Sequence, residues 1–167
     1  WPELDDARAR AALNKTLHFL RKSLGAELIV SRGDEVGLDR ERFRCDALEF
    51  EENFVEGRLE DALALYRGEM MPGFHVPDAP DFERGLDDER ARLRERAREA
   101  AASLIENVTA AGEMDAAARF ARRALEITED ERALRTLITL LDHAGDRAGA
   151  LREFQRFSHR LQVEFGA

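Results

Sequence analysis

The chain has 167 residues and a mass of 19.0 kDa, and its formal net charge at pH 7 is −9. Hydrophobic residues make up 44% and charged residues 37%, which is enough apolar material for a packed core and excludes a mainly disordered chain. No apolar stretch approaches the roughly 20 residues of a membrane-spanning helix, so we expect a soluble protein without a membrane partner.

The residue types present predict a mainly helical protein. Ala, Leu, Arg and Glu dominate, and only 4 prolines and 11 glycines interrupt them. Cys45 is the only cysteine, which excludes an internal disulfide or a multi-cysteine metal site. We therefore expect a reducing, cytoplasmic location and a buried Cys45. The first residue is Trp1 and no initiator methionine is present, so we expect the sequence to be part of a longer protein.

The first predicted helix carries a concentrated positive charge. Asp5 and Asp6 predict its start and Gly25 its end, and between residues 7 and 26 there are basic residues but no acidic ones. Residues 1–44 as a whole carry a net charge of +1 and residues 45–167 one of −10, so the acidic balance belongs to the second part. An apolar stripe along this helix, which must pack against something, consists of Leu13, Leu17, Leu20 and Leu24.

The opposite face of the same helix is basic. A helix with one packed face and one basic face suits the major groove of DNA, where phosphates attract positive charge and base edges accept hydrogen bonds. The residues predicted to face the groove are Arg8, Lys15, His18 and Lys22.

A short β-hairpin is predicted directly after this helix. Residues 28–31 and 35–38 have the pattern of two strands, joined by a turn at residues 32–34. A helix followed by a hairpin is typical of the last part of a winged helix-turn-helix, in which the helix reads the groove. Arg21 and Arg32 are then the predicted phosphate contacts. The alternative is that this segment only packs on the helical part and has no role in DNA binding.

The remainder of the sequence predicts helices arranged as a repeat. Three glycines, Gly57, Gly112 and Gly145, are each followed five residues later by an alanine, and the last two lie close to one tetratricopeptide period apart. Tyr66 and Phe154 follow two of these alanines and are expected to fill the groove between helices. Helices are predicted at residues 46–55, 59–69, 80–111, 115–127, 131–144 and 147–164. The apolar stripe predicted for the long helix at residues 80–111 consists of Phe82, Leu86, Leu93, Ala97, Ala100, Leu104 and Val108.

No motif for catalysis, cofactor binding or metal binding is present. The sequence lacks a nucleophile elbow, a P-loop, a dinucleotide-binding loop and a zinc-protease motif, so we expect neither an enzyme nor a cofactor. His75 lies in a Pro/Gly-containing loop, but no nucleophile is near it in the sequence. Glu49, Glu51 and Glu52 form an acidic cluster without the spacing of a calcium loop, and we expect them on a solvated helix face.

Several blocks of sequence carry a resemblance to a known family. They are Trp1-Pro2-Glu3, Leu20-Arg21-Lys22-Ser23-Leu24-Gly25, Gly37-Leu38-Asp39 leading to Cys45-Asp46, and Leu161-Gln162-Val163-Glu164-Phe165-Gly166. In these blocks the chain resembles the Streptomyces antibiotic regulatory proteins. Residues 1–39 resemble the C-terminal part of an OmpR-type winged helix-turn-helix, and residues 40–167 a tetratricopeptide-like bacterial transcriptional activator domain.

The resemblance implies a mainly α fold in which a helical-hairpin array follows a partial winged domain. It further implies a DNA-binding transcriptional activator that binds promoter DNA as a homodimer and contacts RNA polymerase. The first strands and helices of a complete winged domain are absent from the sequence, so we expect this chain alone to bind DNA weakly. The alternative function is a helical-repeat scaffold that binds a protein or a small effector without contacting DNA.

Overall fold

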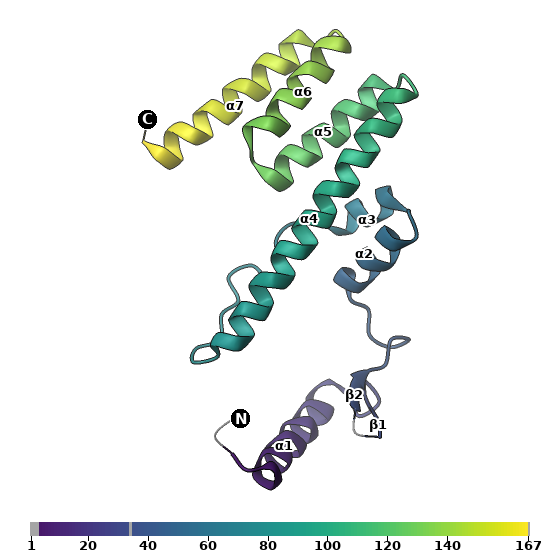
Figure 1. Cartoon of the computed structure of the whole chain (residues 1–167), viewed down its shortest axis with the longest axis vertical. Helices are drawn as coiled ribbons and strands as arrows, with labels where there is room; N and C mark the ends of the chain where they lie inside the picture. Colours follow the sequence, from purple (N-terminus) through teal and green to yellow (C-terminus); the bar gives the residue numbers. More distant parts are fainter. Residues whose placement is uncertain (1–3, 34, 167) are drawn as a thin grey trace. The chain divides into compact units, whose positions relative to one another are not determined.

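The computed structural model describes residues 4–33 and 35–166, and over these residues the chain is mainly helical, with one β-hairpin near its start (Figure 1). The chain divides into two compact units, residues 1–45 and residues 46–167. Trp1, Pro2 and Glu3 of the family resemblance, and Asp34 of the predicted turn, lie outside the described residues.

The first unit contains the predicted helix and hairpin. Helix α1 (Asp6–Leu24) begins where Asp5 accepts a 2.9 Å hydrogen bond from the Arg8 N–H, and it ends at Gly25, whose φ of 109° suits glycine. Strands β1 (Ile29–Arg32) and β2 (Glu35–Leu38) pair antiparallel. Both elements confirm the expectation from the sequence, because their signals are local ones: a cap, a glycine stop and a turn sequence between two short apolar runs.

The second unit consists of helices only, over its described residues. Their number and order agree with the sequence analysis, but α3 stops at Leu65 rather than at residue 69. The chain after Leu65 is held in a loop, because Arg123 donates a hydrogen bond to the Tyr66 carbonyl and Arg90 donates to the carbonyls of Met70 and Met71. The helices are α2 (Asp46–Val55), α3 (Leu59–Leu65), α4 (Pro80–Ala110), α5 (Met114–Thr128), α6 (Glu131–His143) and α7 (Arg147–Phe165).

The three repeat glycines form the same turn three times. Gly57, Gly112 and Gly145 have φ angles of 75°, 79° and 80°, a left-handed conformation that costs glycine little. In each turn the residue after the glycine donates its N–H five residues back, to the carbonyl of Asn53, Val108 or Leu141. This is the Schellman pattern of a helix end, and it turns the chain back into the next helix.

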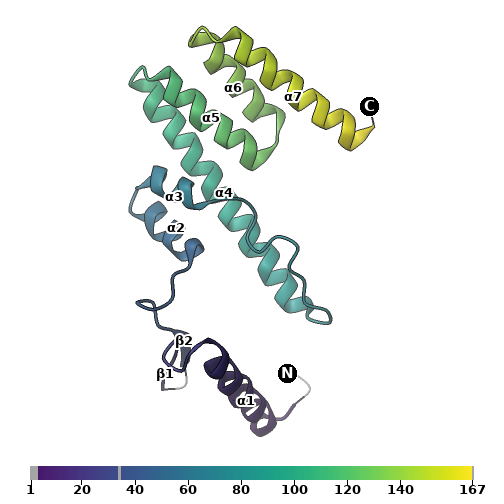
Figure 2. The same cartoon turned by 180° about the vertical axis from the view of Figure 1, so that it is seen from behind.

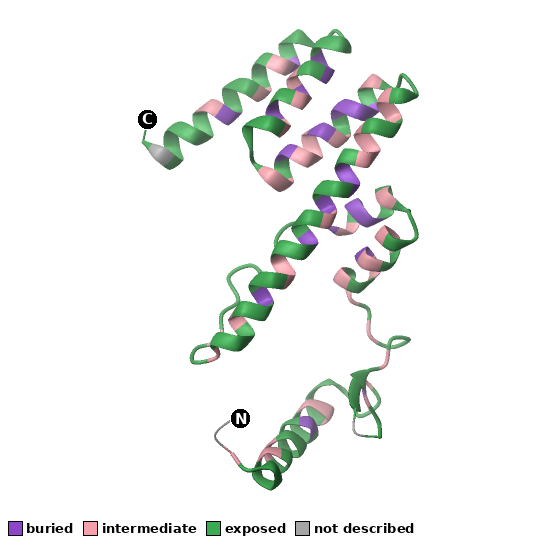
Figure 3. Ribbon diagram, viewed as in Figure 1, coloured by how far each residue is buried: buried purple, intermediate pink, exposed green. Residues whose placement is uncertain are grey.

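Consecutive helices of the second unit pack side by side (Figures 1 and 2), and fully buried small residues occur on both α4 and α5. Ala97, Ala101, Ala117 and Ala121 are fully buried, which lets the two backbones approach closely. Figure 3 shows buried residues along α4, α5 and α6. One core cluster forms around Phe50 and the other around Leu137, the two largest fully buried side chains.

Two aromatic residues differ from the expectation. Phe154 was expected to fill a groove between helices, but it is 52% exposed, and Phe157 is buried in its place. Phe82, which the helical period assigns to the buried stripe of α4, is 47% exposed and meets the ring of Phe74 edge-on. The period identifies the correct helices, but it misjudges which aromatic side chain of a turn faces the core.

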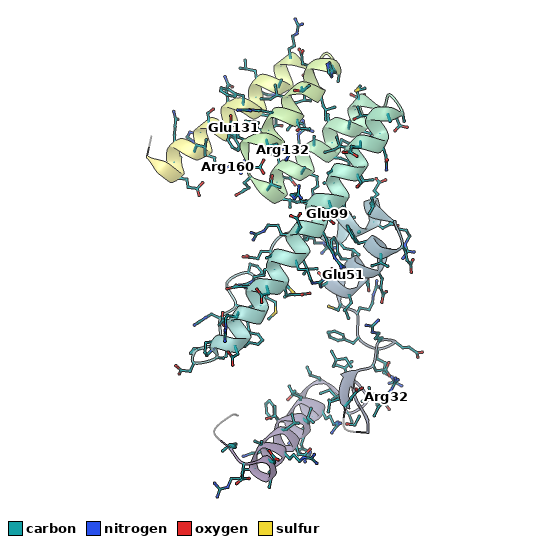
Figure 4. All side chains as sticks on the ribbon, viewed as in Figure 1. Arg32, Glu51, Glu99, Glu131, Arg132 and Arg160 are labelled. Carbon is teal, nitrogen blue, oxygen red and sulfur yellow. The ribbon has the colours of Figure 1, made fainter. Side chains whose placement is uncertain are left out.

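Glu51 also differs, because it is not a solvated carboxylate. Its side chain is 18% exposed, and its Oε2 atom forms ion pairs with Arg92 and Arg96, the first at 2.9 Å (Figure 4). These contacts join α2 to α4. Cys45, which was expected to be buried, is half-buried and free.

The loop between α3 and α4 is fixed by Glu83. Figure 2 shows this loop beside the first half of α4. Glu83 Oε1 accepts a 2.6 Å hydrogen bond from the Val76 N–H and lies 3.2 Å from His75 Nδ1. The Val76 hydrogen bond, with a smaller contribution from His75, lowers the pKa of Glu83 below its ordinary value of 4.5.

We expect Leu137→Ala to lower the free energy of unfolding by about 2–5 kcal/mol, because it leaves a cavity at a fully buried position of α6. The matched control is Leu151→Ala on α7, where the leucine is 57% exposed and the expected change stays within about 0.5 kcal/mol. Urea unfolding followed by circular dichroism measures both. Equal losses from the two variants would contradict the assigned core.

We expect stability to depend on pH through Glu83. Its pKa is lower in the folded chain than in the unfolded one, so its contribution is complete above pH 4.5 and is lost as the pH falls through the lower, folded-state pKa. The Glu83→Gln variant keeps the acceptor oxygen but does not titrate. The difference in urea midpoint between wild type and this variant should therefore shrink as the pH falls below 4.5.

The control for this measurement is Glu60→Gln, which alters an exposed carboxylate that has no partner among the described residues. Its urea midpoint relative to wild type should stay nearly constant over the same pH range. A Glu83→Gln difference that does not change with pH would show that Glu83 does not anchor the loop.

Candidate nucleic-acid interface

The structure places the predicted groove-facing residues on one exposed side of α1. With 3.6 residues per turn, Arg8, Lys15 and Lys22 all lie within about 40° of the direction opposite Leu17. All three are exposed, as is His18 at one margin of this face. The side chains of Lys15, His18 and Lys22 make no hydrogen bond or ion pair with any described residue. Their donors are therefore available to a ligand.

Arg8 is partly engaged. Its Nε atom lies 3.6 Å from Asp5 Oδ2 in an ion pair whose side chains are 78% and 62% exposed. Exposed pairs of this kind contribute little to stability and exchange easily for another anion. Arg8 thus remains able to contact a phosphate, at the cost of a weak local ion pair.

The leucine stripe on the other side of α1 is only partly covered. Leu17 is buried and Leu20 half-buried, whereas Leu13 is 44% and Leu24 57% exposed. Figure 3 shows how few residues of α1 are buried. Phe19, on the basic side, is 66% exposed, so it presents an apolar surface next to the cations.

The hairpin carries Arg32 at its tip. Arg32 is exposed, pairs in register with Glu35, and makes no ion pair with a described residue (Figure 4). Ile29 and Ser31 share one face of β1, while Val30 and Arg32 share the other, because side chains alternate along a strand. Arg32 is thus turned to the face opposite Ile29, the buried residue of the strand.

Arg21 differs from the other predicted contacts because its guanidinium is bound within the unit. Nη2 donates to Ser31 Oγ at 2.9 Å, and Nε donates to the Ile29 carbonyl at 3.3 Å. The sequence predicts Arg21 as a phosphate contact and predicts neither of these partners. No sequence signal points to them, because the contact joins residues eight and ten positions apart across a turn.

The described residues contain no cluster of His, Cys, Asp or Glu that could hold a metal ion. His75 is paired with Glu83 and lies in the anchored loop, as described above. No helix among the described residues is both long enough and apolar enough to cross a lipid bilayer.

Comparison with known protein families finds a match for the helical part of the chain. Residues 49–167, which include α3 to α7 and most of α2, match the bacterial transcriptional activator domain. The match covers well over half of the chain, so the protein belongs to this family of transcription regulators. None of the curated proteins compared with the chain matches it.

Proposed function

We propose that the protein is a transcriptional activator that binds promoter DNA through α1 and the hairpin. The observation that carries this proposal is the basic side of α1, where Lys15, His18 and Lys22 are exposed and have no partner among the described residues. Membership in a family of transcription regulators supports the same function. We place the protein in the cytoplasm and assign it no enzymatic activity and no cofactor.

The proposed binding mode follows from the two faces of α1. The basic face enters the major groove, with Arg8, Lys15, His18 and Lys22 directed at base edges and phosphates. Arg32 at the hairpin tip contacts the backbone next to the groove. Each neutralised phosphate releases a counterion, so the affinity falls as the salt concentration rises.

The helical unit has a different role in this proposal. Residues 45–167 carry a net charge of −10, which repels DNA phosphates, so this unit binds proteins rather than DNA. Contact with RNA polymerase and the formation of a homodimer are the functions that we assign to it.

The alternative, a scaffold that binds a protein or effector without DNA, is favoured by a groove between α4 and α6. Ile105 and Thr109 line one wall, and Thr136 and Leu140 line the other. The groove is largely apolar, with a volume of about 730 Å³, and it is wide open to solvent. Such a surface takes a partner segment whether or not the first unit binds DNA, so only a DNA-binding measurement separates the two functions.

We expect Lys15→Ala and Lys22→Ala in the full-length protein to weaken binding to its own upstream DNA. Each change removes about one phosphate contact, which lowers the slope of log K against log salt by about one unit and the affinity about fivefold at physiological salt. A mobility-shift titration at several salt concentrations measures both quantities.

The control is Arg119→Ala, which removes an exposed cation of α5 that has no partner among the described residues. Its affinity and salt slope should match those of wild type. If wild type binds DNA but the Lys15 and Lys22 variants match it, the basic face of α1 is not the DNA contact. If wild type shows no salt-dependent binding to DNA, the scaffold function is correct instead.

A further inference from the structure

Arg21 lies on the packed side of α1, unlike the groove-facing cations. It follows Leu17 by four residues, which places it about 40° around the helix from this buried leucine. Lys22, the next residue, lies about 140° from Leu17 and is exposed. Two neighbouring cations therefore face different surroundings, with one directed at the hairpin and the other at solvent.

The partners of Arg21 lie along the outer edge of β1. The Asp39 N–H donates to the Leu28 carbonyl, so Leu28 and Asp39 form a hydrogen-bonded pair. In an antiparallel ladder every second pair is hydrogen-bonded, so the next such pair is Val30 with Gly37. At Ile29 and Ser31 the backbone groups of β1 consequently point away from β2. A carbonyl on this open edge has no partner strand to donate a hydrogen bond to it. The Ile29 carbonyl accepts one from the Arg21 Nε–H instead.

Few buried side chains hold the hairpin to the helix in the part of the first unit that the structure describes. Among the described residues of this unit only Leu17 and Ile29 are buried. The ion pairs of Arg42 with Glu27 and Asp39 join the segments that flank the hairpin and do not involve α1. The two hydrogen bonds of Arg21 are therefore a large part of the connection between α1 and β1.

We propose that Arg21 is a positioning residue, which fixes the hairpin against α1 so that Arg32 reaches the DNA backbone beside the groove. This proposal rests on the proposed function. It assigns Arg21 a role different from the phosphate contact predicted from the sequence. Arg21 acts through Arg32, because both hydrogen bonds of Arg21 are made to the strand that ends at Arg32.

The chemistry of the guanidinium makes the proposal testable. Its planar fork donates in two fixed directions, to a carbonyl and to a hydroxyl, whereas a lysine ammonium is a single flexible point charge. Arg21→Lys thus keeps the positive charge but loses the two-point connection. Ser31→Ala removes one acceptor at an exposed position and changes no charge at all.

The first experiment measures the salt slope of DNA binding by the full-length protein and its variants. We expect Arg21→Lys to lower the slope by about one unit and the affinity about fivefold, as Arg32→Ala does, although no charge is lost. Ser31→Ala should have a smaller effect in the same direction. The double variant Arg21→Lys/Arg32→Ala should be no worse than Arg32→Ala alone, because both changes remove the same contact.

A different result would overturn the proposal. If Arg21 contacts a phosphate directly, Arg21→Lys keeps the wild-type slope, Ser31→Ala has no effect, and Arg21→Ala/Arg32→Ala loses about two units. The control is Lys22→Ala, which should lower the slope by about one unit even in the Arg32→Ala background. If wild type shows no salt-dependent binding to DNA, the proposed function is wrong, and with it the role of Arg21 in DNA binding.

The second experiment needs no DNA. Amide hydrogen exchange of Val30 and Arg32, the two β1 residues whose N–H groups face β2, should be faster in Arg21→Lys and Ser31→Ala than in wild type, because the hairpin opens more often when its connection to α1 is weakened. Lys22→Ala should leave this exchange unchanged. If binding to DNA is intact but the exchange in Arg21→Lys equals that of wild type, only the positioning role is wrong and the proposed function stands.

Discussion

The helical period of α1 is the constraint on which the candidate interface depends. One turn every 3.6 residues places Leu17 and Arg21 on the side of the hairpin, and Lys15 and Lys22 on the other side. A shift of two residues in the position of either cation would move it through about 200°, from one face to the other. The two faces thus differ in their contacts. One binds the hairpin through Arg21, and the other exposes the ammonium groups of Lys15 and Lys22, which have no partner among the described residues.

The arrangement of the helical unit has another origin, in repeated turns and small residues. Gly57, Gly112 and Gly145 end helices with the same left-handed turn, so each following helix returns antiparallel. Buried alanines such as Ala97 and Ala117 then let neighbouring helices approach closely. Backbone turns and small side chains thus arrange the helices, and ion pairs such as those of Glu51 with Arg92 and Arg96 add contacts between them.

The elements and their order could be predicted from the sequence because caps, glycine stops and apolar periods act over a few residues. The contacts of Arg21 with Ser31 and of Glu51 with Arg92 could not be predicted, because they join residues brought together only by folding. The loop after α3 could not be predicted for the same reason, since Arg90 of α4 donates hydrogen bonds to the carbonyls of Met70 and Met71 in that loop. The features that the sequence does not predict are thus the tertiary contacts of charged side chains. Their partners depend on which acceptors the folded chain brings within reach of each guanidinium.

The distribution of charge reconciles an acidic chain with an interface for an anionic ligand. Salt screens charges beyond about 8 Å at physiological ionic strength, so a ligand at α1 responds mainly to the nearest side chains. Within residues 7–26 every charged residue is basic, although residues 45–167 carry −10. The net charge of −9 therefore opposes non-specific association with DNA at long range without preventing contact at the basic face. In the binding mode that we propose, affinity therefore depends on how closely the surface of α1 fits the groove rather than on the net charge of the chain.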